Sequence, residues 1–90
     1  MTDLPDRHRH VDIVTMILSA IADVAPELEP ELGDLDHDID FWRELQLDSM
    51  DFLAVMTRLS EQTGVDITER NYPHLTTVNS LRDFLAARAT

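Results

Sequence analysis

The alternation of hydrophobic and polar positions predicts three main helices, the first over residues 9–25. Its apolar stripe recurs every three or four residues and comprises Val14, Ile17, Leu18, Ile21 and Val24 or Ala25, with Ile13, Met16 and Ala20 widening it. A stripe this wide is typical of a helix that packs against two neighbours at once. Pro26 ends the pattern, because proline has no amide hydrogen with which to continue a helix.

The second and third predicted helices are shorter and have clearer ends. The second begins at Ser49 and closes before Gly64, which suits the left-handed residue that often follows a helix. Its predicted apolar face consists of Met50, Leu53, Val55, Met56 and Leu59. The third begins after Thr77, a good N-cap residue. Its apolar positions are Val78, Leu81, Phe84 and Leu85.

The connections between these helices are uneven. Residues 26–40 contain two prolines, one glycine and seven acidic residues but no basic one, so we expect a long loop held by a few apolar anchors. A helical turn is expected near Phe41 and Trp42, with one ring plugging the bundle and the other covering its edge. Residues 65–75 should form a connector with one short helical turn that Pro73 breaks. The fold class is therefore all-α, a small four-helix bundle of three main helices and one short helix with a long first loop.

Length and composition fit a single domain over residues 1–90, with residues 1–8 expected to be flexible. Seven arginines, no lysine and eighteen acidic residues give a net charge of −11, which disfavours binding to nucleic acids and anionic membranes. This charge favours a partner with a basic docking surface, although solubility alone would also explain it. The chain has no cysteine, no signal-like apolar segment and no run long enough to span a membrane, so we expect a cytoplasmic protein.

The stretch LQLDSMDFLAVM, residues 45–56, places a serine where a loop becomes a helix. Asp48 occupies the N-cap position, and its carboxylate can accept a hydrogen bond from the amide of Met50 or Asp51. Ser49 then becomes the first helical residue, with its hydroxyl free to project outward. The positive end of the helix would stabilise a negatively charged group there by about 0.3–1 kcal/mol. Taken alone, the two residues are explained more simply as good helix-start residues.

Around this serine, nearly the whole chain resembles the acyl carrier protein family, from FWRELQLDSMDFLAVMTRLSEQTGVDI to LTTVNSLRDFL. The matching positions are Phe41, Leu45, Asp48, Ser49, Met50, Leu59, Gly64, Val65, Asp66, Ile67, Thr77 and Val78. The resemblance implies a four-helix carrier whose serine, by position Ser49, receives a covalent 4′-phosphopantetheine arm. A separate phosphopantetheinyl transferase would add this arm from coenzyme A. The thiol of the arm would then hold acyl groups as thioesters and present them to acyl-loading and acyl-accepting enzymes.

The same resemblance implies roles for two further sets of residues. Contacts with partner enzymes would come from Asp48, Met50, Asp51, Leu53, Thr57 and Glu61. Core packing is the alternative role for Met50 and Leu53, and solvation is the alternative for Asp51 and Glu61. A bound acyl chain would lie in a cavity lined by Phe41, Val55, Leu59, Ile67 and Leu75. Ordinary core packing explains these five residues as well.

The chain departs from the family pattern in two places. Gln46 stands where the family usually has glycine, so we expect a turn that does not depend on glycine's conformational freedom. The second helix carries fewer acidic residues than many fatty-acid carriers, with Ala54, Thr57 and Ser60 where acids are frequent, and it adds Arg58. We therefore expect a dedicated fatty-acid, polyketide or secondary-metabolite pathway rather than housekeeping fatty-acid synthesis.

An enzyme is poorly supported, because no histidine or lysine neighbours Ser49 and the G-x-S-x-G motif of hydrolases is absent. We also expect no metal site. The DLDHDID segment lacks the glycine and glutamate of a calcium loop, and His8 and His10 lack a third ligand. The predicted function is a freestanding, monomeric, non-catalytic carrier. Two alternatives stay open, an aminoacyl or peptidyl carrier protein and an unmodified acidic protein-interaction module.

Overall fold

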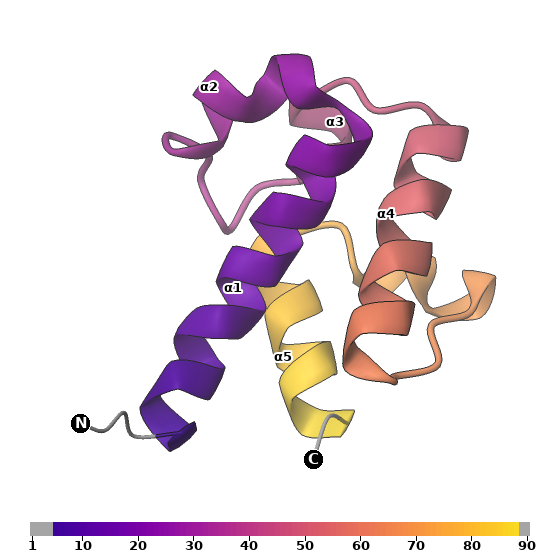
Figure 1. Ribbon diagram of the computed structural model, residues 1–90. Helices are drawn as coiled ribbons and strands as arrows, with labels where there is room; N and C mark the ends of the chain where they lie inside the picture. Colours follow the sequence, from indigo (N-terminus) through magenta and orange to yellow (C-terminus); the bar gives the residue numbers. More distant parts are fainter. Residues whose placement is uncertain (1–4, 89–90) are drawn as a thin grey trace.

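Seven helical segments follow one another in the computed structural model, which describes residues 5–88 and the side chains of residues 13–88. They are α1 (Pro5–Val24), η1 (Pro26–Leu28), α2 (Glu29–Leu32), α3 (Phe41–Glu44), α4 (Ser49–Thr63), η2 (Glu69–His74) and α5 (Val78–Arg88), where η denotes a 3₁₀-helix. The three main helices that the sequence predicts are α1, α4 and α5 (Figure 1). Within the described residues, strand-like pairing is limited to an isolated bridge between Asp40 and Thr77.

Helix α1 begins at Pro5, four residues before the start that the apolar pattern predicts. Of the segment 1–8, which the sequence predicts to be flexible, residues 5–8 form the first turn of α1. Residues 1–4 lie outside the described residues. The helix ends at Val24, close to the predicted stop before Pro26.

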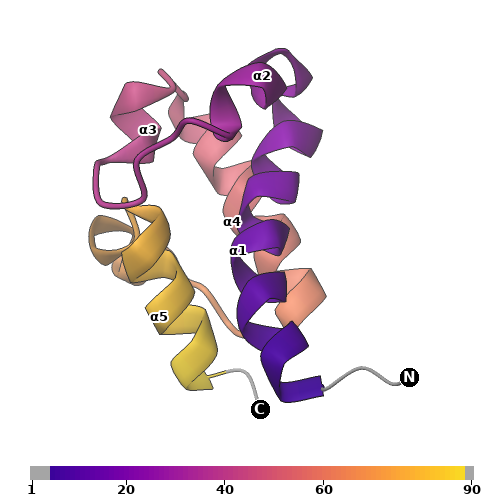
Figure 2. The ribbon, with the colours of Figure 1, turned by 90° about the vertical axis from the view of Figure 1, so that its left-hand side faces the viewer.

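The buried face of α1 is rotated slightly from the predicted stripe. Ile17 and Ile21 are fully buried, whereas Val14 and Leu18 are only half-buried. This helix packs against both α4 and α5, which run beside it in Figures 1 and 2. Contact with two helices explains why the apolar stripe of α1 is wide.

The connection after α1 is long, as predicted, and contains two short helices as well as loop. Pro26 and Pro30 each lie in the first turn of a short helix. Their missing amide hydrogens do no harm there, because first-turn amides have no partner inside the helix. Leu32 and Leu35 are buried and anchor the segment, whereas Ile39 keeps 36 % of its surface exposed.

Helix α3 is the predicted helical turn, and backbone contacts hold it against the segment that leads into α5. The Asp40 carboxylate caps it by accepting a hydrogen bond from the Arg43 amide at 3.0 Å. The Phe41 amide donates to the Thr76 carbonyl at 2.9 Å. Phe41 is thereby turned into the core and fully buried, while Trp42 stays half-buried at the edge, as predicted for this pair.

Helix α4 has the predicted ends, since it begins at Ser49 and is followed by Gly64 with a φ of +74°. Its buried residues are Phe52, Val55, Met56 and Leu59. Met50 and Leu53, which the sequence places on the apolar face, are 77 % and 46 % exposed, so that part of the prediction is wrong. The buried set keeps the i, i+3, i+4, i+7 spacing of a single helix face, and adding Met50 and Leu53 breaks it.

The connector before α5 contains the short helix η2, and Pro73 lies within this helix rather than breaking it. The Thr68 amide donates to the Asn71 side chain at 3.0 Å, which fixes the first turn of η2. The Thr77 hydroxyl accepts from the Ser80 amide at 3.0 Å, which confirms Thr77 as the N-cap of α5. The apolar side of α5 is buried as predicted, completely for Val78, Leu81 and Leu85 and partly for Phe84.

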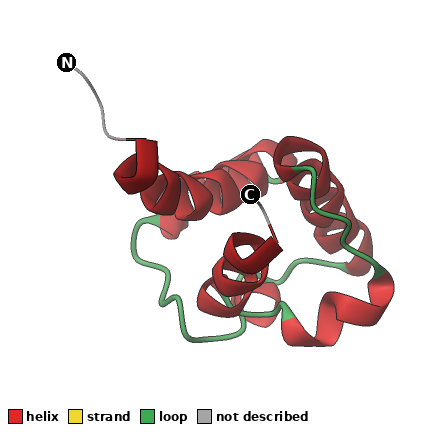
Figure 3. Ribbon diagram, turned by 90° about the horizontal axis from the view of Figure 1, so that it is seen from below, coloured by secondary structure: helices red, strands yellow, loops and turns green. Residues whose placement is uncertain are grey.

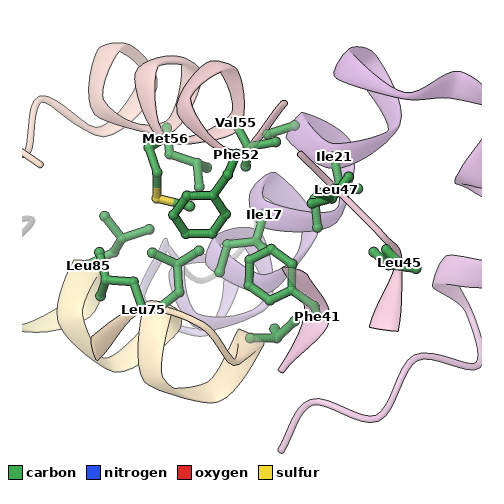
Figure 4. Packing of buried hydrophobic residues seen from close by; sticks show 14 of the residues in the cluster. Ile17, Ile21, Phe41, Leu45, Leu47, Phe52, Val55, Met56, Leu75 and Leu85 are labelled. Atoms are coloured by element: carbon green, nitrogen blue, oxygen red, sulfur yellow. The ribbon is translucent and has the colours of Figure 1, made fainter. Parts of the chain in front are cut away.

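Side chains from α1, α3, α4 and α5 meet in one hydrophobic core (Figure 4). Phe41, Phe52 and Ile17 are among its largest fully buried members. Burying one such side chain stabilises the fold by about 1.5–3 kcal/mol, so these contacts hold α3 and α4 in a fixed relation. Figure 3 shows helices joined by loops throughout, and the all-α bundle that the sequence predicts is confirmed.

Candidate functional site

Ser49 is the first residue of α4, at the end of the bundle where α1 ends (Figure 1). Asp48 precedes it in an extended conformation, and its carboxylate accepts a hydrogen bond from the Asp51 amide at 2.8 Å. This bond confirms the predicted N-cap. Because Asp48 caps the helix, the hydroxyl of Ser49 is not needed for capping and is left for another use.

The turn before the cap fixes the position of Ser49. Leu45 and Leu47 are 6 % and 7 % exposed and insert into the core, and Gln46 lies between them. Gln46 adopts a φ of +58°, in the left-handed region, and its amide donates to the Arg43 carbonyl at 3.1 Å. The expectation that this turn avoids glycine's conformational range is therefore wrong. The turn uses a positive φ, which glutamine adopts at a cost of about 1–2 kcal/mol.

The four serines of the chain differ in what their hydroxyls do. The Ser60 and Ser80 hydroxyls are half-buried and donate to backbone carbonyls at 2.6 Å and 3.0 Å. Ser19 is exposed, but it lies in the body of α1, away from either helix end. Ser49 is exposed at a helix N-terminus, and none of the hydrogen bonds within residues 13–88 involves its hydroxyl. Only Ser49 combines exposure, a free hydroxyl and a helix start.

Beside this serine lies an open pocket of about 670 Å³, which we call the Ser49 pocket. It is lined by Trp42, Ser49, Met50, Phe52, Leu53, Glu69, Tyr72 and Pro73. Trp42 stacks on Phe52 with ring centroids 4.2 Å apart and planes 10° apart, and Tyr72 meets Phe52 edge-on at 5.2 Å. The pocket therefore joins α3, the first turns of α4 and η2 around an aromatic wall.

Charge around Ser49 is mostly negative. Asp48 and Asp51 belong to the cap and first turn of α4, and Glu69 lines the pocket. Burial raises the pKa of the Tyr72 hydroxyl above its usual value, and the nearby Glu69 carboxylate raises it further. The free amides of the first turn of α4 offset this acidity locally, because they form the positive end of the helix dipole.

The residues predicted to contact partner enzymes lie along α4 and its cap. Asp51 is half-buried, and the exposed ones are Asp48, Met50, Leu53, Thr57 and Glu61. The exposure of Met50 and Leu53 removes core packing as their alternative role. The role of all six in docking stays a prediction.

The residues predicted to line an acyl cavity lie in the core or at its margin. Phe41, Val55, Leu59 and Leu75 are at most 1 % exposed, and Ile67 is half-buried against the core. None of these five residues lines the Ser49 pocket. These five residues therefore pack in or against the core, which is the alternative role given for them. An acyl cavity between them stays a prediction.

Five residues of the Ser49 pocket are not among the predicted site residues, namely Trp42, Phe52, Glu69, Tyr72 and Pro73. Phe52 does have a sequence signal, since it begins the i, i+3, i+4, i+7 series that is buried on α4. The three residues of η2 have none, because the position of η2 against α4 is set by tertiary packing.

Neither a metal-binding cluster nor a membrane-spanning helix occurs in the described part of the chain. Among the side chains of residues 13–88, no group of three His, Asp or Glu residues is placed to hold a metal ion. The side chains of His8 and His10 lie outside the described residues. Of the helices within residues 5–88, none is both long and apolar enough to cross a membrane.

An all-α bundle that presents a free serine hydroxyl at a helix start, beside an apolar pocket, has the architecture of a carrier domain. The sequence pattern of the family described as "Phosphopantetheine attachment site" matches residues 15–85, most of the chain. The chain belongs to this family, whose members carry 4′-phosphopantetheine covalently attached to a serine. The resemblance to acyl carrier proteins is thereby confirmed. No curated protein and no solved structure matches the chain.

The surroundings of Ser49 fit this prosthetic group. Its hydroxyl is exposed and free to form an ester. A phosphodiester there would be stabilised by the positive end of α4, by about 0.3–1 kcal/mol. The Ser49 pocket offers apolar surface next to the attachment point.

Proposed function

We propose that Ser49 carries the 4′-phosphopantetheine arm and that the protein is a non-catalytic carrier of acyl groups. The thiol of the arm holds an acyl group as a thioester. The protein's own part is to keep the arm at a fixed, exposed point and to be recognised by the enzymes that load and accept the cargo. The observation that supports Ser49 is its free, exposed hydroxyl at the start of α4, while Ser60 and Ser80 are bonded to backbone carbonyls.

The residues around Ser49 make it a substrate rather than a catalyst. Asp48 caps α4 and keeps the first turn folded up to the attachment point. The lining of the Ser49 pocket contains no histidine or lysine. A general base for the hydroxyl proton therefore has to come from the transferase.

The exposed side of α4 is the docking surface in this proposal, both for the phosphopantetheinyl transferase and for acyl-loading and acyl-accepting enzymes. Met50 and Leu53 offer apolar contact area beside Ser49. Asp51 and Glu61 add negative charge on the same helix, which favours partners with basic surfaces. The net charge of −11 disfavours nucleic acids and anionic membranes and repels a second copy, so the carrier acts as a monomer.

The finer parts of the proposal are acyl rather than aminoacyl cargo and a dedicated pathway. The overall acidity of the chain supports acyl cargo. On α4, Ala54, Thr57 and Ser60 are uncharged, and Arg58 pairs with Asp23 of α1 at 3.7 Å. This less acidic helix supports a dedicated fatty-acid, polyketide or secondary-metabolite pathway. An aminoacyl or peptidyl carrier is the near alternative, because it bears the same arm.

Incubation with coenzyme A and a broad-specificity phosphopantetheinyl transferase, followed by intact mass measurement, tests the attachment. We expect the wild type to gain the mass of one phosphopantetheinyl group and Ser49→Ala to gain none. Ser19→Ala removes another exposed serine and should be modified like the wild type. An unmodified wild type would favour the acidic protein-interaction module, and an adduct on Ser49→Ala would show that the arm belongs elsewhere.

A further inference from the structure

We infer that the Ser49 pocket receives the cargo end of the arm and that this cargo is a compact, neutral, aromatic acyl group. The inference rests on the proposed attachment at Ser49 and adds the chemical class of the cargo. Ser49 itself lines the pocket, so the attachment point and the pocket are continuous. A flexible arm that starts at the edge of a pocket can fold back and place its end inside.

The aromatic wall makes the pocket selective for another flat ring. Trp42 and Phe52 are stacked at 4.2 Å, and Tyr72 is edge-on to Phe52 at 5.2 Å. Trp42 and Tyr72 are only half-buried, which leaves part of each ring open to a ligand. Aromatic rings in stacked or edge-on geometry attract one another beyond the effect of the area they bury. An aromatic cargo is therefore held better than a saturated cargo of the same size.

The pocket meets the packed core at Phe52. Phe52 lines the pocket and also packs in the core, where only 1 % of its surface is exposed (Figure 4). Val55 and Leu75 of the same core are also at most 1 % exposed. A long linear chain would have to displace these packed side chains, which is unfavourable in a close-packed interior. A compact group fills the pocket without that displacement.

Charge around the pocket favours a neutral cargo. Glu69 lines the pocket, and Asp48 and Asp51 lie at the adjoining end of α4. Of the residues that line the pocket, none is basic. A dicarboxylic acid held by one end would bring its free carboxylate close to these acids without a counter-charge.

The test loads Ser49 with amide-linked analogues of two cargoes, phenylacetyl and cyclohexylacetyl, which are similar in size but differ in aromaticity. Intact mass confirms that each arm is attached. Trp42 is the only tryptophan, so quenching of its fluorescence by acrylamide reports how well the cargo covers the pocket. We expect phenylacetyl to protect Trp42 more strongly, with a docked-to-free ratio about 2- to 10-fold above that of cyclohexylacetyl.

Two substituted proteins and one contact measured by nuclear magnetic resonance make the test more specific. Tyr72→Leu removes one aromatic ring from the wall but keeps an apolar side chain, and should reduce the difference between the two cargoes. Phe84→Leu is the matched control, because Phe84 is a half-buried aromatic of α5 that does not line the pocket. In the loaded wild type, we expect nuclear Overhauser contacts between the phenylacetyl ring and the Trp42 indole.

The possible failures can be told apart. Equal protection by the two cargoes in the wild type would overturn the inference and leave the proposed function intact. The absence of contacts between the phenylacetyl ring and the Trp42 indole would also overturn the inference and leave the proposed function intact. This measurement uses the wild type alone. A chain that takes no arm would contradict the proposed function, and the cargo assignment with it.

Discussion

Gln46 holds a left-handed conformation two residues before the cap of α4. The neighbouring leucines explain why. Leu45 and Leu47 both insert into the core, and between them the chain reverses at the end of α3, where the Leu47 amide donates to the Trp42 carbonyl at 2.9 Å. Glycine would adopt the same φ without steric cost, which accounts for the glycine usual at this place in acyl carrier proteins. Here the anchoring leucines impose the conformation on glutamine.

Replacing Gln46 by glycine should raise the free energy of unfolding by about 0.5–1 kcal/mol. The relief of left-handed strain exceeds the extra entropy that glycine loses on folding. Gln46→Val should lower the same free energy by about 1–2 kcal/mol, because a β-branched side chain fits this φ poorly. Urea unfolding followed by circular dichroism measures both changes. A Gln46→Gly protein less stable than the wild type would contradict the left-handed turn.

Local chemistry determines the two ends of helix α4, but it does not determine which face of the helix is buried. Asp48 and Gly64 mark the ends by a side-chain cap and a positive φ, each acting within a few residues. By hydrophobicity alone, Met50 and Leu53 resemble core residues. They are exposed because the neighbouring helices cover the side of α4 that carries Phe52.

Phe52 and Leu53 should therefore respond very differently to truncation. Phe52→Ala should lower the free energy of unfolding by about 3–5 kcal/mol, because it leaves a cavity where the ring contacts Trp42 and Tyr72. Leu53→Ala, at a position that is 46 % exposed, should lower it by less than about 1 kcal/mol. Thermal and urea unfolding compare the two variants. Similar losses at both positions would show that α4 is rotated from the orientation in Figure 4.

Tyr72, in η2, contributes to the free energy of unfolding, and this contribution depends on pH. Its pKa is raised in the folded state, by burial and then by Glu69, so the unfolded chain loses this proton at a lower pH. The contribution is complete below the unfolded pKa of about 10 and is lost as pH rises through the folded pKa. As pH rises above about 10, the wild type should lose more stability than Tyr72→Phe. Parallel stability profiles for the two proteins in urea would contradict this shift.

Features with local causes were predictable from the sequence, and features that depend on packing were not. Asp48 and Thr77 mark helix starts through side-chain chemistry that acts over three residues. The short helices of residues 26–32 escaped prediction because proline indicates a break, although it is also well suited to a first turn. Tyr72 escaped because its contact with Phe52 joins distant parts of the chain.

Negative charge is the property of the molecule as a whole that bears most on its partners. The net charge of −11 is reached without a lysine, and residues 26–40 alone supply seven of the acids. Such a field attracts a basic surface from a distance and speeds encounter. Salt screens this attraction over about 10 Å at 0.1 M ionic strength.

Modification of Ser49 by a transferase with a basic docking surface should slow about tenfold between roughly 0.02 M and 0.3 M salt. At low salt, Asp51→Lys should lower kcat/KM several-fold. Asp83→Lys makes the same change in net charge on α5 and should have a smaller effect. Initial rates from intact mass measure all three proteins. Equal effects of the two substitutions would contradict a docking surface on α4.

Peptide mapping is the sharpest test of the assignment of the arm to Ser49. Trypsin cleaves after arginine, and the arginines of this chain place its four serines in four separate peptides. After reaction with coenzyme A and a transferase, fragmentation spectra should show the phosphopantetheinyl group only on the peptide of residues 44–58, at Ser49. The group on any other peptide, or on none after exposure to active transferase, would contradict the assignment.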